Sequence, residues 1–161
     1  VVGDALTFDF IGHLQRRKVP AVLAATRLIH SVDSERLARE IAARATGPTR
    51  VLIEVNISEE PTKHGILPGQ IEAFVETISP FPAIVIGGLM ALPPAESNPE
   101  HSRPYFRQLR RLCDELTRRW QGRHDFGELS MGTSQDFVVA VEEGATLVRI
   151  GRSLIDRSQV T

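Results

Sequence analysis

Short runs of apolar and β-branched residues alternate with longer segments of helical periodicity along almost the whole chain. We expect strands at residues 6–11, 28–31, 51–56, 84–90, 128–130 and 147–150. Strands that alternate with helices predict βα units and a parallel sheet. The runs are mostly apolar, as is typical of strands covered on both faces. The fold class is therefore α/β.

The segments between these strands carry the spacing of amphipathic helices. We expect helices over residues 34–45, 71–78 and 99–120. In the first of them Leu37, Ile41 and Ala45 recur every four residues, and Gly47 follows as a stop signal. The third carries many arginines, but acidic residues interrupt them, so we interpret this face as solvated rather than as a binding surface.

Six βα units without internal symmetry fit either an open doubly wound sheet or an incomplete barrel, and the second fits better. A closed eight-stranded barrel normally needs at least about 200 residues, whereas this chain has 161. We therefore expect one domain over residues 1–161: a TIM-type (β/α)8 barrel, incomplete, with about six βα units. The two absent strands would precede Val1.

Charge and cysteine content restrict the partners and the compartment. Lys and Arg total 19 against 20 for Asp and Glu, so nothing in the balance favours nucleic acid or an anionic membrane. The single cysteine, Cys113, is interpreted as a buried helix residue and fits a reducing compartment. No apolar run approaches the roughly 18 residues of a membrane span. We expect a cytoplasmic monomer.

The strongest functional signal comes from two segments near the C-terminal end, SMGTSQDF at residues 130–137 and LVRIG at residues 147–151. In barrels a phosphate site commonly lies in the loops after strands seven and eight, where glycine allows backbone amides to approach an anion. The candidate phosphate ligands are Ser130, Gly132, Thr133, Ser134, Arg149 and Gly151. Helix capping by Thr133 or Ser134, with Asp136 in the first turn, is the alternative, and the two are compatible.

Six segments in order resemble the YggS/PROSC family of pyridoxal phosphate homeostasis proteins. They are FIGHLQRRK (10–18), HSVD (30–33), VNISEEPTKHG (55–65), GLMALP (88–93), SMGTSQD (130–136) and VRIG (148–151). The resemblance implies a barrel similar to the N-terminal domain of alanine racemase, with pyridoxal phosphate as cofactor. It also implies a role in intracellular vitamin B6 homeostasis without established turnover, and apo-enzymes as possible recipients of the cofactor.

The resemblance also assigns residues. It implies that the phosphate lies against the candidate ligands named above, and that Met90 and Asn56 border the ring. Lys63 matches the lysine of the family's LysxGly motif and is a secondary candidate for an imine. The alternative for Lys63 is a loop lysine that pairs with Glu59 or Glu60. The family's Schiff-base lysine lies on the first barrel strand, which this sequence does not contain.

At four places the sequence departs from the family pattern. Asp9 stands where the family usually has His, Arg17 where it has Asn, and Gly87 where it has Arg. Thr133 and Ser134 replace the MetSer of the family's GlyMetSer. The exchange at the phosphate keeps a hydrogen-bonding group, whereas Asp9 is expected to alter contacts near the ring.

Two enzymatic alternatives remain. A pyridoxal phosphate-dependent racemase needs a second acid/base group across the ring, and the only tyrosine, Tyr105, falls on an outer helix. A sugar-phosphate barrel enzyme needs paired carboxylates at strand ends, for which Glu54 and Asp9 are the candidates. The five histidines lack metal-ligand spacing, so the sequence predicts no metal and no catalytic residue.

Overall fold

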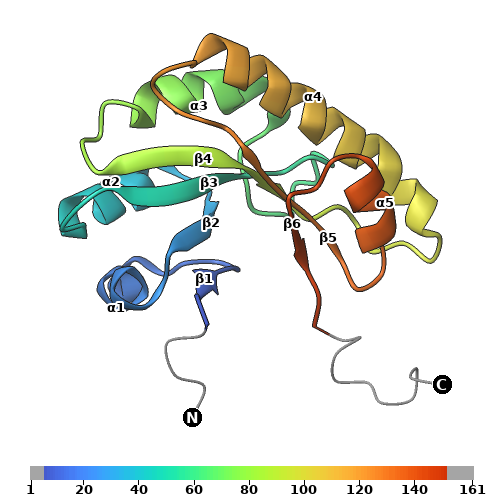
Figure 1. Cartoon of the computed structure of the whole chain (residues 1–161), viewed down its shortest axis with the longest axis horizontal. Coiled ribbons are helices and arrows are strands. Elements are labelled where there is room, and N and C mark those ends of the chain that lie inside the picture. Colours follow the sequence, from blue (N-terminus) through green and yellow to red (C-terminus); the bar gives the residue numbers. More distant parts are fainter. Residues whose placement is uncertain (1–5, 152–161) are drawn as a thin grey trace.

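The computed structural model describes residues 6–151 and shows a curled sheet of parallel strands with helices on its outer side (Figure 1). Within these residues the sheet has six strands in the order β1-β2-β3-β4-β5-β6, so each strand pairs with its successor in the chain. Neighbouring parallel strands joined by helices are the arrangement of a TIM-type barrel. The predicted incomplete barrel is confirmed.

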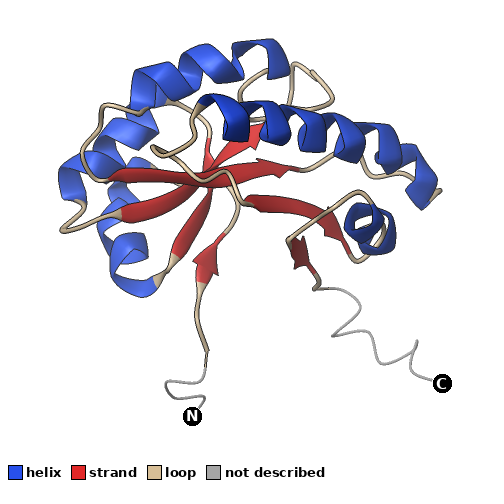
Figure 2. Cartoon of the chain, turned by 45° about the horizontal axis from the view of Figure 1, so that its top comes forward, coloured by secondary structure: helices blue, strands red, loops and turns tan. Residues whose placement is uncertain are grey.

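The strands and helices alternate through the described part of the chain (Figure 2). The strands are β1 (Asp9–Phe10), β2 (Leu28–Val32), β3 (Thr49–Val55), β4 (Ile84–Ala91), β5 (Glu128–Thr133) and β6 (Leu147–Arg149). The helices are α1 (Val19–Ala25), α2 (Glu35–Arg44), α3 (Ile71–Ile78), α4 (Arg103–Arg119) and α5 (Phe137–Glu142), with 3-10 turns η1 (Arg16–Lys18), η2 (Pro68–Gln70) and η3 (Pro99–Ser102).

The two faces of the sheet bury different sets of side chains. On the outer face, residues such as Val51, Ile53 and Phe106 join one large core between the strands and the helices. On the inner face, a smaller cluster consists of Leu28, Leu52 and Met90, with Leu147 packed against it. Strands β2, β3, β4 and β6 all contribute to this inner cluster, which requires the sheet to curl on itself. The chain thus forms part of a barrel, and this inner apolar cluster, the floor of the barrel, fills the lower part of its interior.

The predicted strands are all present, with shifted ends. The sequence placed the end of the fifth strand at residue 130, but β5 continues to Thr133. The first strand was expected over six residues, and β1 pairs with β2 only at Asp9 and Phe10. Helix α1 was not predicted, because its sequence, VPAVLAA, is too short to display a full period. Pro20 in its first turn was the available signal.

The helices largely follow their predicted bounds. Ser34 begins α2 by accepting a hydrogen bond from the Leu37 amide at 3.4 Å. The expected helix over 99–120 divides into η3 and α4. Cys113 is buried there, as predicted; burial raises the pKa of its thiol to about 12, and Sγ donates to the Phe126 carbonyl. No helix within residues 6–151 is long and apolar enough to cross a membrane.

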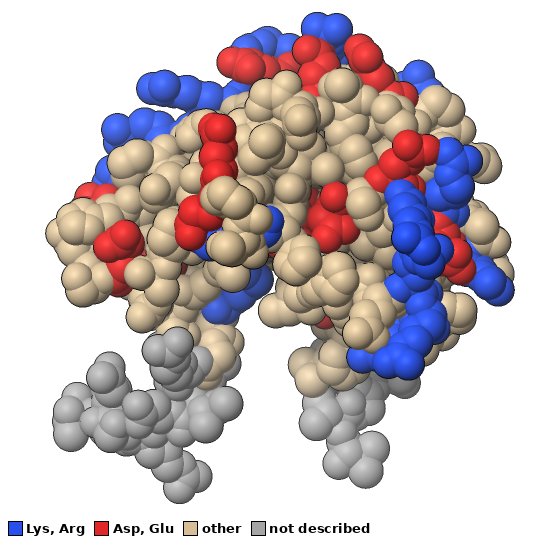
Figure 3. Space-filling view, turned by 180° about the vertical axis from the view of Figure 1, so that it is seen from behind, with Lys and Arg blue, Asp and Glu red and all other residues tan. Residues whose placement is uncertain are grey.

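The arginine-rich face of α4 forms ion pairs rather than a free basic surface. Arg103 and Arg107 each lie 2.8 Å from Glu143 Oε1, which follows α5. The two guanidinium groups hold the pKa of Glu143 down at about 2. On the side drawn in Figure 3, basic and acidic side chains are interspersed over the helical layer at the top of the view. This agrees with the interpretation of a solvated face.

Gly88 lies where β4 and β5 approach each other closely. Its φ is +153°, and a Cβ would lie 1.9 Å from the Glu128 carbonyl oxygen. We expect Gly88→Ala to lower the free energy of unfolding by at least about 2 kcal/mol, because the strands must separate to admit the methyl group. Gly122→Ala is the matched control, since its φ is +83° but no atom lies within 4 Å. It should cost only the left-handed backbone penalty of about 1 kcal/mol. Equal urea midpoints for the two variants would contradict this account.

Candidate functional site

The two C-terminal turns lie side by side, as the sequence predicted. β5 and β6 are paired, with Thr133 opposite Arg149. Beyond the strands, the Gly151 amide donates to Ser134 Oγ at 3.3 Å. The loops that follow the two strands are therefore joined directly, and their backbones border one location at the rim of the barrel.

Gly132 allows the first of these turns to pack against α5. Its φ is +91°, and an added Cβ would lie 2.5 Å from Ala140 Cβ and 3.1 Å from Phe137 Cα. Any side chain would push the turn away from the helix. The turn is further held by Asp136, whose Oδ1 accepts from the Thr133 amide at 2.8 Å and from Thr133 Oγ1 at 3.1 Å. The capping alternative is wrong, because α5 begins at Phe137 with Asp136 as its N-cap and no side-chain cap, and Thr133 and Ser134 precede the helix. The Thr133 donors are engaged within the turn.

Arg149 points into the barrel. Its Nη1 donates to Ser130 Oγ at 2.7 Å and its Nη2 to the Ala91 carbonyl at 2.9 Å. Within residues 6–151 no carboxylate lies within 4 Å of this guanidinium, and burial lowers its pKa. A guanidinium stays charged even so. The site therefore contains a partly buried positive charge that has hydrogen bonds but no ion-pair partner in the described part of the chain, which suits an anionic ligand.

Ser130 also belongs to a polar chain that crosses the barrel interior. Its Oγ lies 2.9 Å from His30 Nδ1 on β2, and His30 Nε2 lies 3.5 Å from Asp9 Oδ2 on β1. Asp9 is fixed in turn by Arg27, whose Nη2 donates to Oδ2 at 2.9 Å. No role for His30 was predicted from the sequence, although the HSVD segment that contains it is one of those that resemble the family.

The environment shifts the pKa values of these groups. Burial lowers the pKa of His30, although the hydrogen bond and charge of Asp9 act in the opposite direction. Burial would raise the pKa of Asp9, but the Arg27 hydrogen bond and charge outweigh it, and the net shift is downward. On β3, burial and then the charge of Asp33 raise the pKa of Glu54. A neutral His30 therefore faces an ionised Asp9.

Met90 and Asn56, predicted to border a ring, lie on the inner side of the site. Met90 is 5% exposed and packs with Leu28 and Leu52. Asn56 is buried; its Nδ2 donates to the Glu60 carbonyl at 2.8 Å, and its Oδ1 has no hydrogen-bond partner among residues 6–151. A buried amide oxygen without a partner is uncommon in folded proteins and marks a position that a ligand donor could satisfy. Both assignments stay predictions.

Lys63 adopts the ion-paired arrangement that the sequence analysis gave as its alternative. Its Nζ lies 2.7 Å from Glu60 Oε1, and 3.4 Å from both Ser58 Oγ and the Leu92 carbonyl oxygen. Hydrogen bonds to Lys63 and Ser58 lower the pKa of Glu60. The contact with Leu92 connects the loop after β3 to the loop after β4, at the same rim as the other candidate residues.

Comparison with known proteins identifies the family. The model of the alanine racemase N-terminal domain matches residues 7–157. The chain belongs to this family. Similar proteins named pyridoxal phosphate homeostasis protein include those of Aquifex aeolicus (47% identical), Vibrio cholerae (36%) and Homo sapiens (36%). The matches cover 92%, 93% and 92% of this chain but only 66%, 64% and 58% of the relatives, so the chain spans less than two thirds of their length.

Solved structures agree with this assignment. PipY of Synechococcus elongatus without PLP has a TM-score of 0.85 and 31% identity, with 94% of this chain and 71% of PipY covered. The structure of PipY with PLP bound has a TM-score of 0.80 and 30% identity, with 92% and 70% covered. The alanine racemase of Clostridium difficile, at 16% identity, has a TM-score of 0.71 over 92% of this chain and 41% of its own, and shows the fold alone.

Burial of neutral His30 predicts a pH dependence of stability. Because the folded-state pKa lies below the ordinary 6.5, the unfolded chain binds a proton that the folded chain does not. The free energy of unfolding should therefore fall as pH drops below about 6.5 toward the lowered pKa. His30→Gln should flatten this slope between about pH 7 and 5, while His101→Gln, an exposed control, should leave it unchanged. Denaturant titrations across this range give the measurement; parallel curves for His30→Gln and the parent would refute it.

Proposed function

We propose that this protein binds pyridoxal phosphate and serves intracellular vitamin B6 homeostasis rather than catalytic turnover. The observation that carries the proposal is the Arg149 guanidinium, held inside the barrel by Ser130 with no carboxylate within 4 Å among residues 6–151. Beside it lie the two joined turns of Ser134 and Gly151. The names of the relatives and the PipY structure with PLP bound support the same ligand.

The chain's own residues divide into three tasks. The turns at Gly132, Ser134 and Gly151 offer backbone and hydroxyl donors to the phosphate, the Gly151 amide once it turns from Ser134 Oγ. Arg149 with Ser130 adds positive charge and a hydrogen bond. Met90 provides an apolar wall and Asn56 a polar edge for the ring. When bound, pyridoxal phosphate supplies an aldehyde that condenses reversibly with amines. Thr133 contributes once its donors turn from Asp136 toward the ligand.

The cellular setting is part of the proposal. A protein that holds the cofactor without consuming it can release it to apo-enzymes, and we propose a cytoplasmic monomer in that role.

The racemase alternative requires a second acid/base group across the ring. Tyr105, the candidate considered from the sequence, lies on α4, and this helix covers the outer face of the sheet. An assay for amino-acid racemisation by the yellow, cofactor-loaded protein separates the two, and turnover would overturn our proposal.

Arg149→Met tests the anion site. The full chain is titrated with pyridoxal phosphate, and binding is followed by absorbance. We expect Arg149→Met to weaken binding about 10- to 100-fold, because it removes a charge-assisted interaction worth roughly 1.5–3 kcal/mol. Arg119→Met is the matched control, since Arg119 is exposed on α4 and pairs with Glu72. Unchanged binding by Arg149→Met, or an equal loss of affinity in both variants, would show that Arg149 does not form the anion site.

Lys63 can be tested separately as an amine acceptor. An ammonium paired with a carboxylate has no free electron pair for attack on an aldehyde. We therefore expect borohydride reduction of the cofactor-loaded protein, followed by peptide mapping, to leave Lys63 essentially unlabelled. Glu60→Gln removes the ion pair and should increase the label on Lys63. Strong labelling of Lys63 in the parent would establish it as an acceptor, and no increase in Glu60→Gln would show that the ion pair does not protect it.

A further inference from the structure

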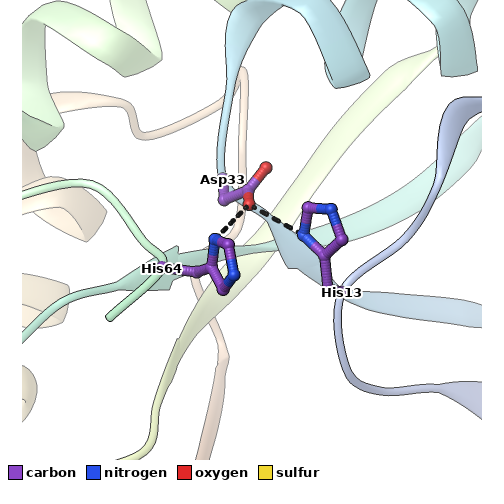
Figure 4. A group of neighbouring side chains, drawn as sticks. All are labelled: His13, Asp33 and His64. Carbon is purple, nitrogen blue, oxygen red and sulfur yellow. Dashed lines mark ion pairs between the residues drawn. The ribbon is translucent and has the colours of Figure 1, made fainter. Parts of the chain in front are cut away.

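Two histidines and an aspartate that are far apart in the sequence meet at the opposite part of the rim from Arg149. His13 Nδ1 lies 3.5 Å from Asp33 Oδ2, and His64 Nδ1 lies 3.9 Å from the same oxygen. The two imidazole rings are stacked, with centroids 4.6 Å apart. Figure 4 shows the Asp33 carboxylate beside the two rings, with a dashed line from one oxygen to a nitrogen of each ring. One possible ligand atom from each residue lies within 4.8 Å of the others.

Each of the three residues follows a different strand. His13 comes after β1, Asp33 directly after β2, and His64 in the loop after β3. The loop of His64 is anchored, since the Ile66 amide donates to the Glu54 carbonyl at 2.8 Å and Ile66 bridges Val55. Asp33 precedes Ser34, the N-cap of α2, whose Oγ donates to Asp33 Oδ1 at 3.1 Å. The carboxyl ends of adjacent parallel strands therefore fix the geometry.

The charge of this cluster favours a cation. In the described part of the chain, no Lys or Arg nitrogen lies within 4 Å of the Asp33 carboxylate; its ion-pair partners are the two histidines. Glu54 adds a second carboxyl group near enough to interact electrostatically with Asp33 and both imidazoles. The Asp33 side chain is only 11% exposed, whereas those of His13 and His64 are 52% and 64% exposed. Asp33 thus places a buried negative charge in the cluster, and the two exposed histidines leave one side of the cluster open to solvent.

We propose that His13, Asp33 and His64 bind a divalent transition-metal ion, most readily Zn²⁺, with a coordination position open to solvent. Imidazole nitrogen selects such ions over Mg²⁺ and Ca²⁺. Zinc binds nitrogen and oxygen at about 2.0–2.2 Å, which places tetrahedral ligands about 3.3 Å apart. The two separations from Asp33, 3.5 and 3.9 Å, are slightly longer, and all three ligand atoms lie within 4.8 Å of one another. Binding requires the exposed histidines to rotate out of their stacked arrangement so that both ring nitrogens point at the ion. The proposal is independent of pyridoxal phosphate and differs from the sequence-based expectation of no metal.

The chain offers its own control. His101 Nδ1 lies 3.5 Å from Glu96 Oε2, the same separation as in the His13 pair, and His101 is also exposed. It lacks the second imidazole. If the cluster were only a set of ordinary ion pairs, the two locations would behave alike toward a metal.

The test is calorimetric titration of Zn²⁺ into the metal-free full chain, with Co²⁺ absorption as a second readout of coordination. We expect one ion per chain. His13→Ala combined with His64→Ala should weaken binding by more than about 10-fold, the least that loss of even an outer partner costs at many metal sites. Asp33→Asn should weaken it similarly, and His101→Ala should not. Circular dichroism confirms that the variants fold.

Absence of saturable binding would overturn the proposal. So would equal affinity in the double variant and in His101→Ala, because the ion would then bind scattered histidines. Since none of these residues contacts the Arg149 site in the described structure, failure here leaves pyridoxal phosphate binding untouched, and failure of cofactor binding leaves the metal titration interpretable.

Discussion

The curl of the parallel sheet brings side chains from strands that are not neighbours into contact, and the Arg149 site depends on it. Leu28, Leu52, Met90 and Leu147 fill the floor of the curled sheet. Above that floor His30 on β2 reaches Ser130 on β5, although β3 and β4 lie between those strands in the sheet. In a flat sheet of the same order these two side chains could not meet. The apolar floor therefore positions the polar residues above it.

The polar chain from Asp9 to Arg149 has a stability cost that its hydrogen bonds must offset. Buried polar groups are tolerated when each finds a partner. Ser130 meets this condition with His30 Nδ1, and Arg149 meets it with Ser130 and the Ala91 carbonyl, whereas His30 Nε2 has no hydrogen-bond partner among the described residues. Within residues 6–151 the charge of Arg149 has no carboxylate within 4 Å, and Asp136 and Glu54 act on it only at longer range. Residues that satisfy hydrogen bonding but leave charge unbalanced are typical of binding sites rather than of a structural core.

Local sequence patterns were sufficient to predict the strands, most of the helices and the two C-terminal turns. Apolar runs and helical spacing are properties of residues that are close in the sequence. The turns at Gly132 and Gly151 are likewise indicated by the glycines themselves. The His13, Asp33 and His64 cluster could not be found in this way, because each residue follows a different strand and only the pairing of β1, β2 and β3 brings them together. Metal-ligand spacing within a single segment is the signal that sequence shows, and it is absent here. The direction of Arg149 was open for a similar reason, since the sequence does not determine the curl.

The rim of the barrel is divided by charge, and Glu54 lies between its two halves. Its carboxyl group interacts electrostatically with Asp33, His64 and His13 on one side and with Arg149 on the other. The half formed by β1, β2 and β3 thus suits a cation, whereas the half formed by β5 and β6 suits an anion. A cation beside Asp33 would lower the electrostatic cost of ionising Glu54, and an ionised Glu54 would in turn reduce the positive field at Arg149. Any coupling between the two halves must be reciprocal in binding free energy, and Glu54 is the residue through which it would act.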